Sequence, residues 1–427
     1  MSLAGSPTLR TQPDHRRGEL KLTVWIAGVG MTPFGIHTDQ SVKQLTKWAV
    51  HDALADAGCP LDAIGAAFFG STTQGHLEGQ LMIAGEVALR SLGLGTVPVF
   101  NIENACATGL SGISLACAQL RAGDADVVLV VGVEKMNVGD SARTMSVFDG
   151  AYDISEPDSL QDSLSQLGGV VDTSAVGARS IMMDVYAAMA RNHMRLYGTT
   201  AEQIAAVAAK NHRHGVGNPR AHFRKDMSIE QILSARKLAY PLTVPMCAPI
   251  TDGAAAVLLC SDAGLRKLGQ EPAVKILAAS IGTGCDRDIS TFDNHVTART
   301  AHHAYDRAGI SPDDVDVAEV HDATAFAEVL QTELLGLVPA GDGGPAAQRG
   351  DTTLGGRIPV NPSGGLESKG HPLAATGIGQ VFEITNQLRG RSGSRQVEDA
   401  RTGVIENGGG FHNGEEAVVG VAILQRQ

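Results

Sequence analysis

The sequence predicts an α/β protein built from two similar halves, with a long insertion between them. Short apolar runs alternate with helix-like segments that end in glycine, which is typical of strands and helices in succession. Two sequence patterns also recur in the same order, at offsets of about 250 to 260 residues. A chain of 427 residues with 43% hydrophobic content is long enough for two or three domains, or for one large duplicated fold.

A helix that leads into a buried strand is the clearest local element. Apolar residues from Leu110 to Leu120 follow helical spacing, and Arg121-Ala122-Gly123 is a typical helix end. The run DVVLVVG at 126–132 is apolar and β-branched throughout, as expected of a parallel strand covered on both faces.

The two recurring patterns indicate a duplication. AGCPLD at 57–62 is repeated as AGISPDD at 308–314, and VPV at 97–99 is repeated as IPV at 358–360. We therefore predict an N-terminal half from residues 20–150 and 241–264 and a C-terminal half from residues 265–427. The insertion at 151–240 is predicted to carry function, and the polar stretch 4–20 is interpreted as an arm outside the fold.

Charge and apolar run lengths exclude several functions. With 34 basic and 46 acidic residues the net charge is −12, which argues against a nucleic-acid binder, because basic side chains dominate affinity for phosphates. The run VVLVVGV at 127–133 is far shorter than the ~20 residues of a membrane helix. The N-terminus lacks the apolar region of a secretory signal, so we expect a cytoplasmic protein that contacts no membrane.

Six cysteines without a C-x-x-C pair are interpreted as reduced thiols. Cys106, in NACATG at 104–109, follows a strand-like run and begins the helix described above. The positive end of a helix lowers the pKa of a thiol, so Cys106 is a candidate nucleophile. The alternative is a small packed residue, and that interpretation suits the other five, which are Cys59, Cys117, Cys247, Cys260 and Cys285.

His371 lies in a glycine-rich segment, GGLESKGHP at 364–372, directly before a predicted helix of the second half. The duplication places this segment where the first half has Cys106, so the two loops would bring a thiol and an imidazole together. The alternative is a glycine-rich loop that holds a structural histidine.

Two further segments lie where strands of the second half are expected to end. They are VHDAT at 320–324 and ENGGGF at 406–411. Consecutive glycines allow a backbone N–H to approach a reacting oxygen, although a lone GGG more often marks a tight turn.

These four segments together resemble the thiolase superfamily. NACATG is similar to its nucleophilic cysteine loop, GHP at 370–372 to its histidine motif and GGG at 408–410 to its terminal motif, and the similarity extends from Val24 to Leu424. The sterol-carrier-protein-2 type is the branch it resembles most. Its marks here are His321-Asp322, Ser368-Lys369, KNHRH at 210–214 with Asn218-Pro219, and TDGAAA at 251–256.

The resemblance implies a five-layered αβαβα fold with an inserted loop domain, a homodimer or homotetramer, and acyl-CoA as substrate, without a permanently bound cofactor or metal. It also implies that Cys106 carries the acyl group after His371 takes its proton. Backbone N–H groups of Cys106 and Gly408 would hold the oxyanion, and His321 would polarise a second thioester carbonyl.

Some positions differ from the family pattern. Thiolases of this type carry a second cysteine, but the two positions where it is found hold Ala323 and Glu406 here. A carboxylate at Glu406 is a candidate base if burial raises its pKa, and the alternative is a solvated or paired, inert glutamate. Ala374 replaces a usual glycine and Thr324 a usual aromatic residue, and both are expected to reshape the acyl pocket.

Basic residues are concentrated in the insertion, between Arg191 and Lys225. A solvated face is the commonest explanation, and the four histidines there lack the spacing of a metal site. The resemblance places coenzyme A in this region, where part of the cluster would complement its phosphates. The candidates are Arg213, Arg220, Arg224 and Lys225.

The sequence thus predicts an acyl-CoA C-acyltransferase that cleaves a 3-oxoacyl-CoA with CoA, or catalyses the reverse Claisen condensation. Two alternatives stay open, because the second cysteine of the family pattern is missing. One is a thiolase-like subunit that needs a small acyl-CoA-binding partner protein. The other is a thiolase-like lyase that performs a retro-aldol cleavage.

Overall fold

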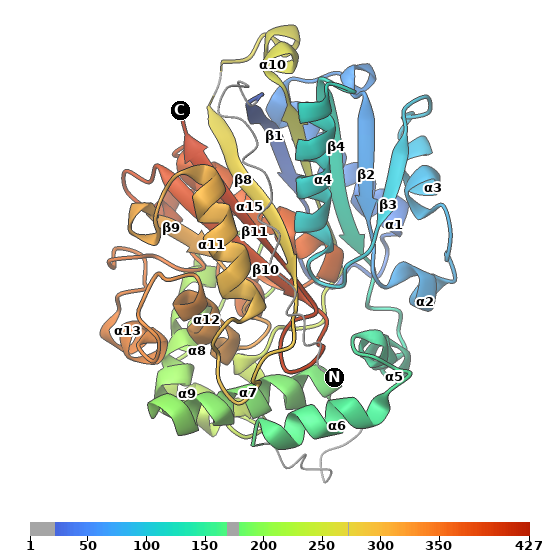
Figure 1. Ribbon diagram of the computed structural model, residues 1–427. Coiled ribbons are helices and arrows are strands. Elements are labelled where there is room, and N and C mark those ends of the chain that lie inside the picture. The colour runs from blue at the N-terminus through green and yellow to red at the C-terminus, as the bar shows by residue number, and fades with distance from the viewer. Residues whose placement is uncertain (1–21, 169–178, 272) are drawn as a thin grey trace, which may run out of the picture.

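The computed structural model describes residues 22–168, 179–271 and 273–427 (Figure 1). The arm predicted at residues 4–20 lies outside the described residues. Figure 1 shows the strands of the two halves next to each other, with the helices of the insertion gathered at one end of them.

The strands of the first half form one side of the sheet. Their order is β3-β2-β4-β7-β1, in which β2 is parallel to β3 and β4, and β7 is antiparallel to β4 and β1. The predicted parallel strand β4 is therefore parallel on one side only. The bounds are Val24–Met31 for β1, Ala66–Gly70 for β2, Val99–Ile102 for β3, Val127–Glu134 for β4 and Gly253–Cys260 for β7.

The second half repeats this arrangement. Its order is β8-β11-β10-β9, in which β11 is antiparallel to β8 and β10, and β9 is parallel to β10. Val360 forms a parallel bridge with Ala318 of β9, where the first half has β3. Only Val24 and Trp25 of β1 pair with β8, so a short stretch of strand pairing joins the two halves of the sheet. The bounds are Val274–Thr283 for β8, Val317–Glu319 for β9, Thr402–Gly409 for β10 and Val418–Arg426 for β11.

The recurring sequence patterns occupy equivalent places, which confirms the predicted duplication. Helix α1 (Val42–Ala57) ends at Gly58 with φ 56°, and α11 (Val296–Ala308) ends at Gly309 with φ 71°. Each left-handed glycine is followed by one 3₁₀ turn and then by a strand, β2 or β9. The VPV and IPV segments lead into β3 and into the Val360 bridge.

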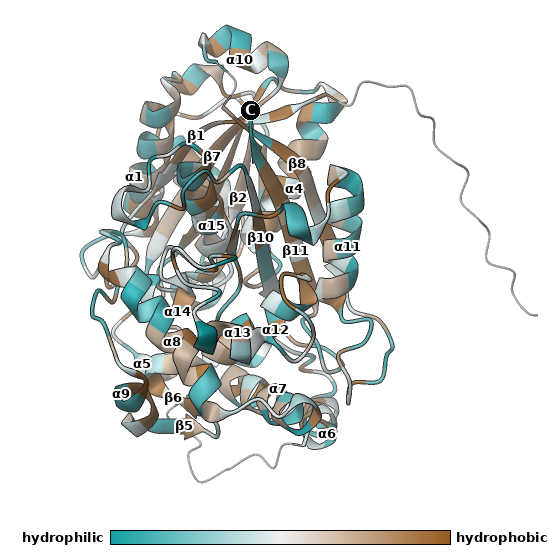
Figure 2. Ribbon diagram, turned by 90° about the vertical axis from the view of Figure 1, so that its left-hand side faces the viewer, coloured by the Kyte–Doolittle hydropathy of each residue, from teal (hydrophilic) through white to brown (hydrophobic). Residues whose placement is uncertain are grey.

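Helices occupy three layers around the strands of the two halves, as predicted; these strands form one continuous sheet and are called the first sheet and the second sheet by half. α4 (Thr108–Ala122) and α15 (Leu373–Leu388) pack on each other and on strands of both halves, so they form the middle layer. α1 and α3 (Ala84–Arg90) cover the first sheet, and α11 covers the second. Figure 2 shows hydrophobic strands enclosed by helices with hydrophilic outer surfaces. Burial of these apolar faces is the main stabilising term of the fold.

The insertion folds around a second hydrophobic core, shared with α12 (Ala325–Leu334) of the C-terminal half. Its helix α8 (Ala201–Val216) contacts α12, α13 (Gly343–Arg349) and α14 (Gly365–Lys369). The insertion therefore rests on the half that carries His371. Its other elements are α6 (Pro157–Gln166), α7 (Ile181–Tyr197), α9 (Ile229–Ser234), β5 (Lys237–Ala239) and β6 (Leu242–Thr243); outside it lie α2 (Gln74–Glu78), α5 (Ser141–Met145) and α10 (Asp262–Leu268).

Three further predictions can be compared with the structure. All six cysteines are free thiols, as predicted. No described helix combines the length and the apolar character that a membrane span needs. The sequence placed Glu406 and Gly408 after a strand, and this was wrong, because β10 continues through Gly409 and pairs Gly408 with Val419 of β11.

Candidate active site

Cys106 lies on a tight turn between β3 and α4. Ala105, directly before it, has a positive φ of 47°, which is unusual for a residue with a Cβ atom. The hydroxyl of Thr108 holds this turn, because it accepts the N–H of Asn104 at 2.8 Å and donates to the carbonyl of Ala105 at 2.6 Å. The turn therefore presents the thiol in a fixed direction, just before the first turn of α4.

His371 is held by two hydroxyl groups from other elements. Its backbone N–H donates to the hydroxyl of Thr251 at 2.8 Å, and its Nδ1 lies 2.7 Å from the hydroxyl of Thr376. That hydroxyl donates to the carbonyl of Pro372 at 3.1 Å, so it accepts the proton on Nδ1. The unprotonated Nε2 then faces Cys106, as a general base requires.

The two predicted loops meet. Nε2 of His371 lies 3.3 Å from Sγ of Cys106, and Nε2 of His321 lies 3.4 Å from the same nitrogen. Cys106 comes from the first half and both histidines come from the second. The structure therefore brings together the thiol and the two imidazoles that the sequence singled out.

Burial decides the protonation of these groups. It lowers the pKa of His371 well below its usual value, with smaller effects from His321 and Lys369, and it lowers the pKa of His321 to about 4. Both imidazoles are therefore neutral at pH 7, and His371 is free to accept a proton.

The pKa of Cys106 differs from the sequence-based expectation. Proximity to a helix N-terminus predicted a lowered pKa, but burial, together with the charges of Glu134 and Glu103, raises it to about 12. The resting group is consequently a thiol and not a standing thiolate. His371 has to remove its proton as the bond to the substrate forms.

Glu406 lies beside these residues without opening into the cavity. Its Oε2 accepts the backbone N–H of His321 at 2.9 Å, while its buried Oε1 has no partner among the described residues. Burial raises its pKa well above the usual value, and Glu416 and Asp322 add to the rise. This environment matches the condition under which the sequence proposed Glu406 as a base.

The terminal glycines pass close to the cysteine loop. A Cβ atom on Gly409 would lie 2.5 Å from the carbonyl oxygen of Asn104, so only glycine fits there. Gly410 lines the cavity, whereas Gly408 faces the side chain of Glu416. Gly409 thus makes the close backbone approach to the cysteine loop, and the oxyanion role that the resemblance gives to the N–H of Gly408 stays a prediction.

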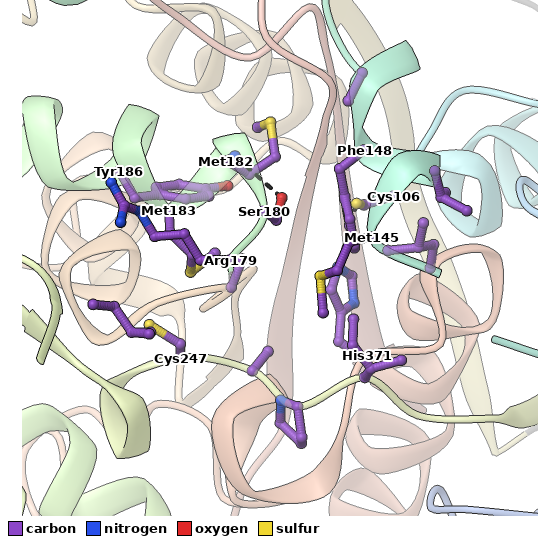
Figure 3. A pocket seen from close by; sticks show the side chains of 18 of the residues that line it. Cys106, Met145, Phe148, Arg179, Ser180, Met182, Met183, Tyr186, Cys247 and His371 are labelled. Atoms are coloured by element: carbon purple, nitrogen blue, oxygen red, sulfur yellow. Dashed lines mark hydrogen bonds between the residues drawn. The ribbon is translucent and has the colours of Figure 1, made fainter. Parts of the chain in front are cut away.

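A cavity of about 510 Å³ opens onto Cys106, His371 and His321. Figure 3 shows Cys106 and His371 on one side of this cavity and residues of the insertion, including Met183 and Tyr186, on the other. Ala323 lines it, whereas Ala374 and Thr324 do not, so any effect of these two on the pocket is exerted from behind its lining and stays a prediction. Its apolar lining includes Met145, Phe148, Met182, Met183, Met227, Leu238, Val244, Pro245, Ile250 and Leu373.

Only one of the four basic candidates for coenzyme A lines this cavity, and it is Lys225. Arg213 lines a separate hollow, and Arg224 donates to the carbonyl of Val216. Arg220 donates to the carbonyl of Met31 and lies 3.6 Å from Asp52. Arg236 also lines the cavity and was not predicted.

Part of the basic cluster is buried, which the sequence did not predict. Lys210 pairs with Glu328 at 2.8 Å, and His212 and His214 are both less than 5% exposed. Next to Lys210, the amide of Asn211 donates to Asp322, Glu328 and Glu367. Lys210, Asn211 and His214 fasten α8 to the C-terminal half and are not a solvated face. His212 instead contacts the carbonyl of Pro245 and lines the cavity.

Two supporting residues were missed because their roles depend on distant contacts. Thr251 holds the backbone of His371, and Asp252 accepts from Lys135, Met136 and Asn137. The family-like run TDGAAA at 251–256 was the only signal for them in the sequence.

Cys106, His321 and His371 are also residue types that bind metal ions. One donor atom each from Cys106, His321 and His371 lies within 4.8 Å of the others, which matches three zinc ligands. However, Nδ1 of His321 has no partner among the described residues, whereas zinc-binding histidines usually donate their second nitrogen. The set suits a nucleophile with a base better than it suits a metal.

Comparison with known proteins identifies the family. The thiolase N-terminal domain family matches residues 24–237, and the thiolase C-terminal domain-like family matches residues 286–422. The chain belongs to the thiolase family. This finding confirms the family and the fold that the sequence predicted.

Three curated relatives show the range within this thiolase family. Sterol carrier protein 2 of Bos taurus is 36% identical over 91% of this chain and 70% of its own length. Acetyl-CoA acetyltransferase of Methanothermobacter thermautotrophicus is 38% identical over 91% of this chain and 96% of its own length. Benzoylsuccinyl-CoA thiolase subunit BbsB of Thauera aromatica is 34% identical over 89% and 92%.

Solved structures share the fold of this chain. A chain of the Ltp2-ChsH2(DUF35) aldolase superposes with a TM-score of 0.76 at 23% identity, covering 95% of this chain and 98% of that one. Human mitochondrial 3-ketoacyl-CoA thiolase in complex with CoA gives a TM-score of 0.69 at 18% identity, covering 96% and 99%. At such identities the likeness concerns the fold alone.

Proposed function

We propose that this thiolase cleaves a 3-oxoacyl-CoA with CoA, or catalyses the reverse Claisen condensation. The distance of 3.3 Å between Sγ of Cys106 and Nε2 of His371, at the wall of the large cavity, is the observation that carries the proposal. A thiol paired with a neutral imidazole is the arrangement that covalent acyl transfer needs.

In the first half-reaction His371 takes the proton of Cys106 while Sγ attacks the 3-oxo carbon. Backbone N–H groups of Cys106 and Gly408 hold the oxyanion, and His321 polarises the thioester carbonyl. The C2–C3 bond breaks and its electron pair goes to C2. The protonated carboxyl of Glu406, whose side chain has to turn from behind His321 into the cavity, delivers a proton there. The products are the CoA thioester that carries C1 and C2, which is acetyl-CoA for an unbranched chain, and an acyl group on Cys106 that the second half-reaction releases as the shortened acyl-CoA.

In the second half-reaction the carboxylate of Glu406 takes the thiol proton of CoA. The CoA sulfur then attacks the acyl-cysteine, and the departing sulfur of Cys106 recovers its proton from His371. Glu406 therefore ends protonated again, and each group returns to its starting state. The raised pKa and the unpaired Oε1 of Glu406 support this assignment.

A covalent adduct tests the nucleophile. Cys106→Ala should abolish acylation by a 3-oxoacyl-CoA, measured by intact-protein mass spectrometry. Cys247 lines the same cavity, so Cys247→Ala is the matched control and should retain the adduct. An adduct that persists in Cys106→Ala, on Cys247 or elsewhere, overturns the assignment.

Lys225 is proposed to contact a phosphate of CoA, because it is the candidate that lines the cavity. Lys225→Ala should raise KM for the CoA thioester about tenfold without lowering kcat, since the lost contact is made equally in the ground and transition states. Arg213→Ala is the control, because Arg213 lines another hollow. Equal KM values in the two variants argue against Lys225.

A homodimer is also proposed. Among the described strands β3 pairs only with β2, so its outer edge is open, and Phe100 on it is 42% exposed. Leu81, Met82 and Ile83 of the first half are also exposed. Phe100→Glu should convert the dimer into monomers, which light scattering would detect.

A second candidate is a lyase or a subunit that works with a small partner protein. It is favoured by the absence of a cysteine at Ala323 and Glu406. Two similar proteins, one named as a thiolase subunit and one as an aldolase complex, agree with it. Release of an aldehyde or ketone without consumption of CoA would favour the lyase, and full thiolysis by the purified chain would exclude the need for a partner.

A further inference from the structure

Tyr186 is a buried phenol in the wall of the catalytic cavity that the mechanism above does not use. It belongs to α7 of the insertion, and its side chain is only 5% exposed. Figure 3 shows its hydroxyl end directed toward the side of the cavity that holds Cys106 and His371. The insertion therefore contributes a polar group to a wall that is otherwise mostly apolar.

No hydrogen bond is found for the hydroxyl of Tyr186 in the described part of the chain, and because it is not among the fully buried unpaired atoms there, it is open to the cavity. A buried tyrosine usually pairs its hydroxyl. Tyr305 in α11 is the comparison, because it is 6% exposed and donates to the carbonyl of Leu335 at 3.0 Å. An unpaired donor in a substrate cavity is the feature expected of a group that pairs with the substrate.

Burial fixes the role of Tyr186 as a donor. Burial raises the pKa of Tyr186 well above 10, and Glu416, Cys106, Glu406 and Asp322 contribute in the same direction. The phenol therefore stays protonated throughout the physiological range. It can donate a hydrogen bond but cannot serve as a base.

We propose that Tyr186 is a further catalytic residue, whose hydroxyl donates a hydrogen bond to the thioester oxygen of the substrate when negative charge develops there. Its cavity-facing position and its unpaired hydroxyl carry this inference, which rests on the proposed function. When the C2–C3 bond breaks, the electron pair spreads from C2 onto the thioester oxygen, giving an enolate. Tyr186 keeps its proton in this step, and Glu406 supplies the proton to C2.

Two measurements separate this role from a structural one. Exchange of the α-protons of acetyl-CoA into deuterated water requires the enolate, whereas transfer of the acetyl group to Cys106 does not. Tyr186→Phe should lower the exchange rate about 10²-fold, the usual effect of removing one oxyanion donor. Acetylation of Cys106 should stay within about threefold of the wild-type rate. Tyr305→Phe should change neither rate.

The outcomes are distinguishable. Wild-type exchange in Tyr186→Phe, or an equal loss of exchange and acetylation, overturns the role of Tyr186. A wild-type enzyme that shows neither activity overturns the proposed function instead. If Tyr186→Phe fails to fold, 3-fluorotyrosine at position 186 replaces it as the probe. The more acidic phenol is a stronger donor and should maintain or raise the exchange rate, and a lower rate contradicts the inference.

Discussion

Two buried glutamates flank the catalytic residues, and their hydrogen bonding differs. Glu134 ends β4 of the first half and accepts the N–H groups of Thr72 and Thr73, the hydroxyl of Thr73 and the N–H of Ala374. Glu406 lies in β10 of the second half and accepts one N–H, that of His321. Both are 0% exposed, and burial raises the pKa of both.

This difference in hydrogen bonding indicates that Glu134 has a structural role and that Glu406 has an oxygen left for proton transfer. Glu134 ties three segments together, and these are the loop after β2, the end of β4 and the start of α15. Its oxygens are occupied by donors that belong to the fold. Glu406 keeps one oxygen unpaired at a substantial cost in desolvation, and proteins tolerate this cost mainly at functional sites.

The largest expected effect comes from Glu406→Gln. An amide cannot exchange the α-proton, so the rate of α-proton exchange should fall by about 10² to 10⁴. Acetylation of Cys106 should remain within about threefold, because His371 still takes the thiol proton. The check is proton exchange by NMR beside acylation by mass spectrometry. Wild-type exchange would make Glu406 as structural as Glu134.

Glu134→Gln should produce the opposite result, a loss of stability. An amide nitrogen cannot accept the N–H groups of Thr72 or Thr73, so the free energy of unfolding should fall by about 1.5 to 3 kcal/mol. Urea unfolding measures this change. The α-proton exchange per folded molecule should stay at the wild-type rate, and a tenfold loss of exchange would contradict the comparison.

A third buried glutamate, Glu416, lies near Glu406 and raises its pKa. Burial in turn raises the pKa of Glu416 itself to about 7. A raised carboxyl pKa means that the folded protein holds a proton which the unfolded chain has lost above pH 4.5. The contribution of Glu416 to stability is therefore present below pH 4.5 and is lost as the pH rises toward 7.

The corresponding experiment compares wild type with Glu416→Gln by urea unfolding at pH 5 and pH 7.5. Between pH 5 and 7.5 the wild type should lose about 2.5 kcal/mol relative to the variant, since one pKa unit corresponds to about 1.4 kcal/mol. Glu202→Gln, at an exposed position in α8, is the control and should follow the wild type. Parallel pH profiles for wild type and Glu416→Gln would contradict the prediction.

The smallest expected effect concerns one donor to Glu134. Thr73→Val removes a hydroxyl that donates to Oε2, and it should lower the free energy of unfolding by about 1 kcal/mol. Thr332→Val is the matched control, because its hydroxyl only donates to the carbonyl of Glu328 in its own helix. Thermal melting of both variants gives the comparison. An equal loss in the two variants would show that Glu134 does not depend on this donor.

The sequence predicted the fold because the two halves repeat local signals. The glycine stop after α1 and after α11, and the apolar runs of β4 and β10, depend on neighbouring residues only. The extent of β10 was underestimated, because pairing with β11 extends it through Gly409. Such pairing joins residues that are distant in the sequence.

The site could be predicted only in part, for a similar reason. Motifs located Cys106, His371 and His321, which the structure brings within hydrogen-bond reach of one another. The direction of the shift in the pKa of Cys106 was wrong, because it depends on burial and on Glu134 rather than on the adjacent helix. Tyr186 was missed, because nothing in the local sequence of α7 shows that its hydroxyl reaches the cavity.

The catalytic pair of Cys106 and His371 lies across the boundary between the two halves. Only Val24 and Trp25 of β1 pair with β8, yet the thiol of Cys106 and the imidazole of His371 face each other from opposite sides of the duplication. The distance between these two atoms is therefore also a gauge of how the halves are docked. A ligand or substitution that rotates one half relative to the other therefore changes this distance, and with it the reactivity of Sγ of Cys106, even when it binds or lies far from the site.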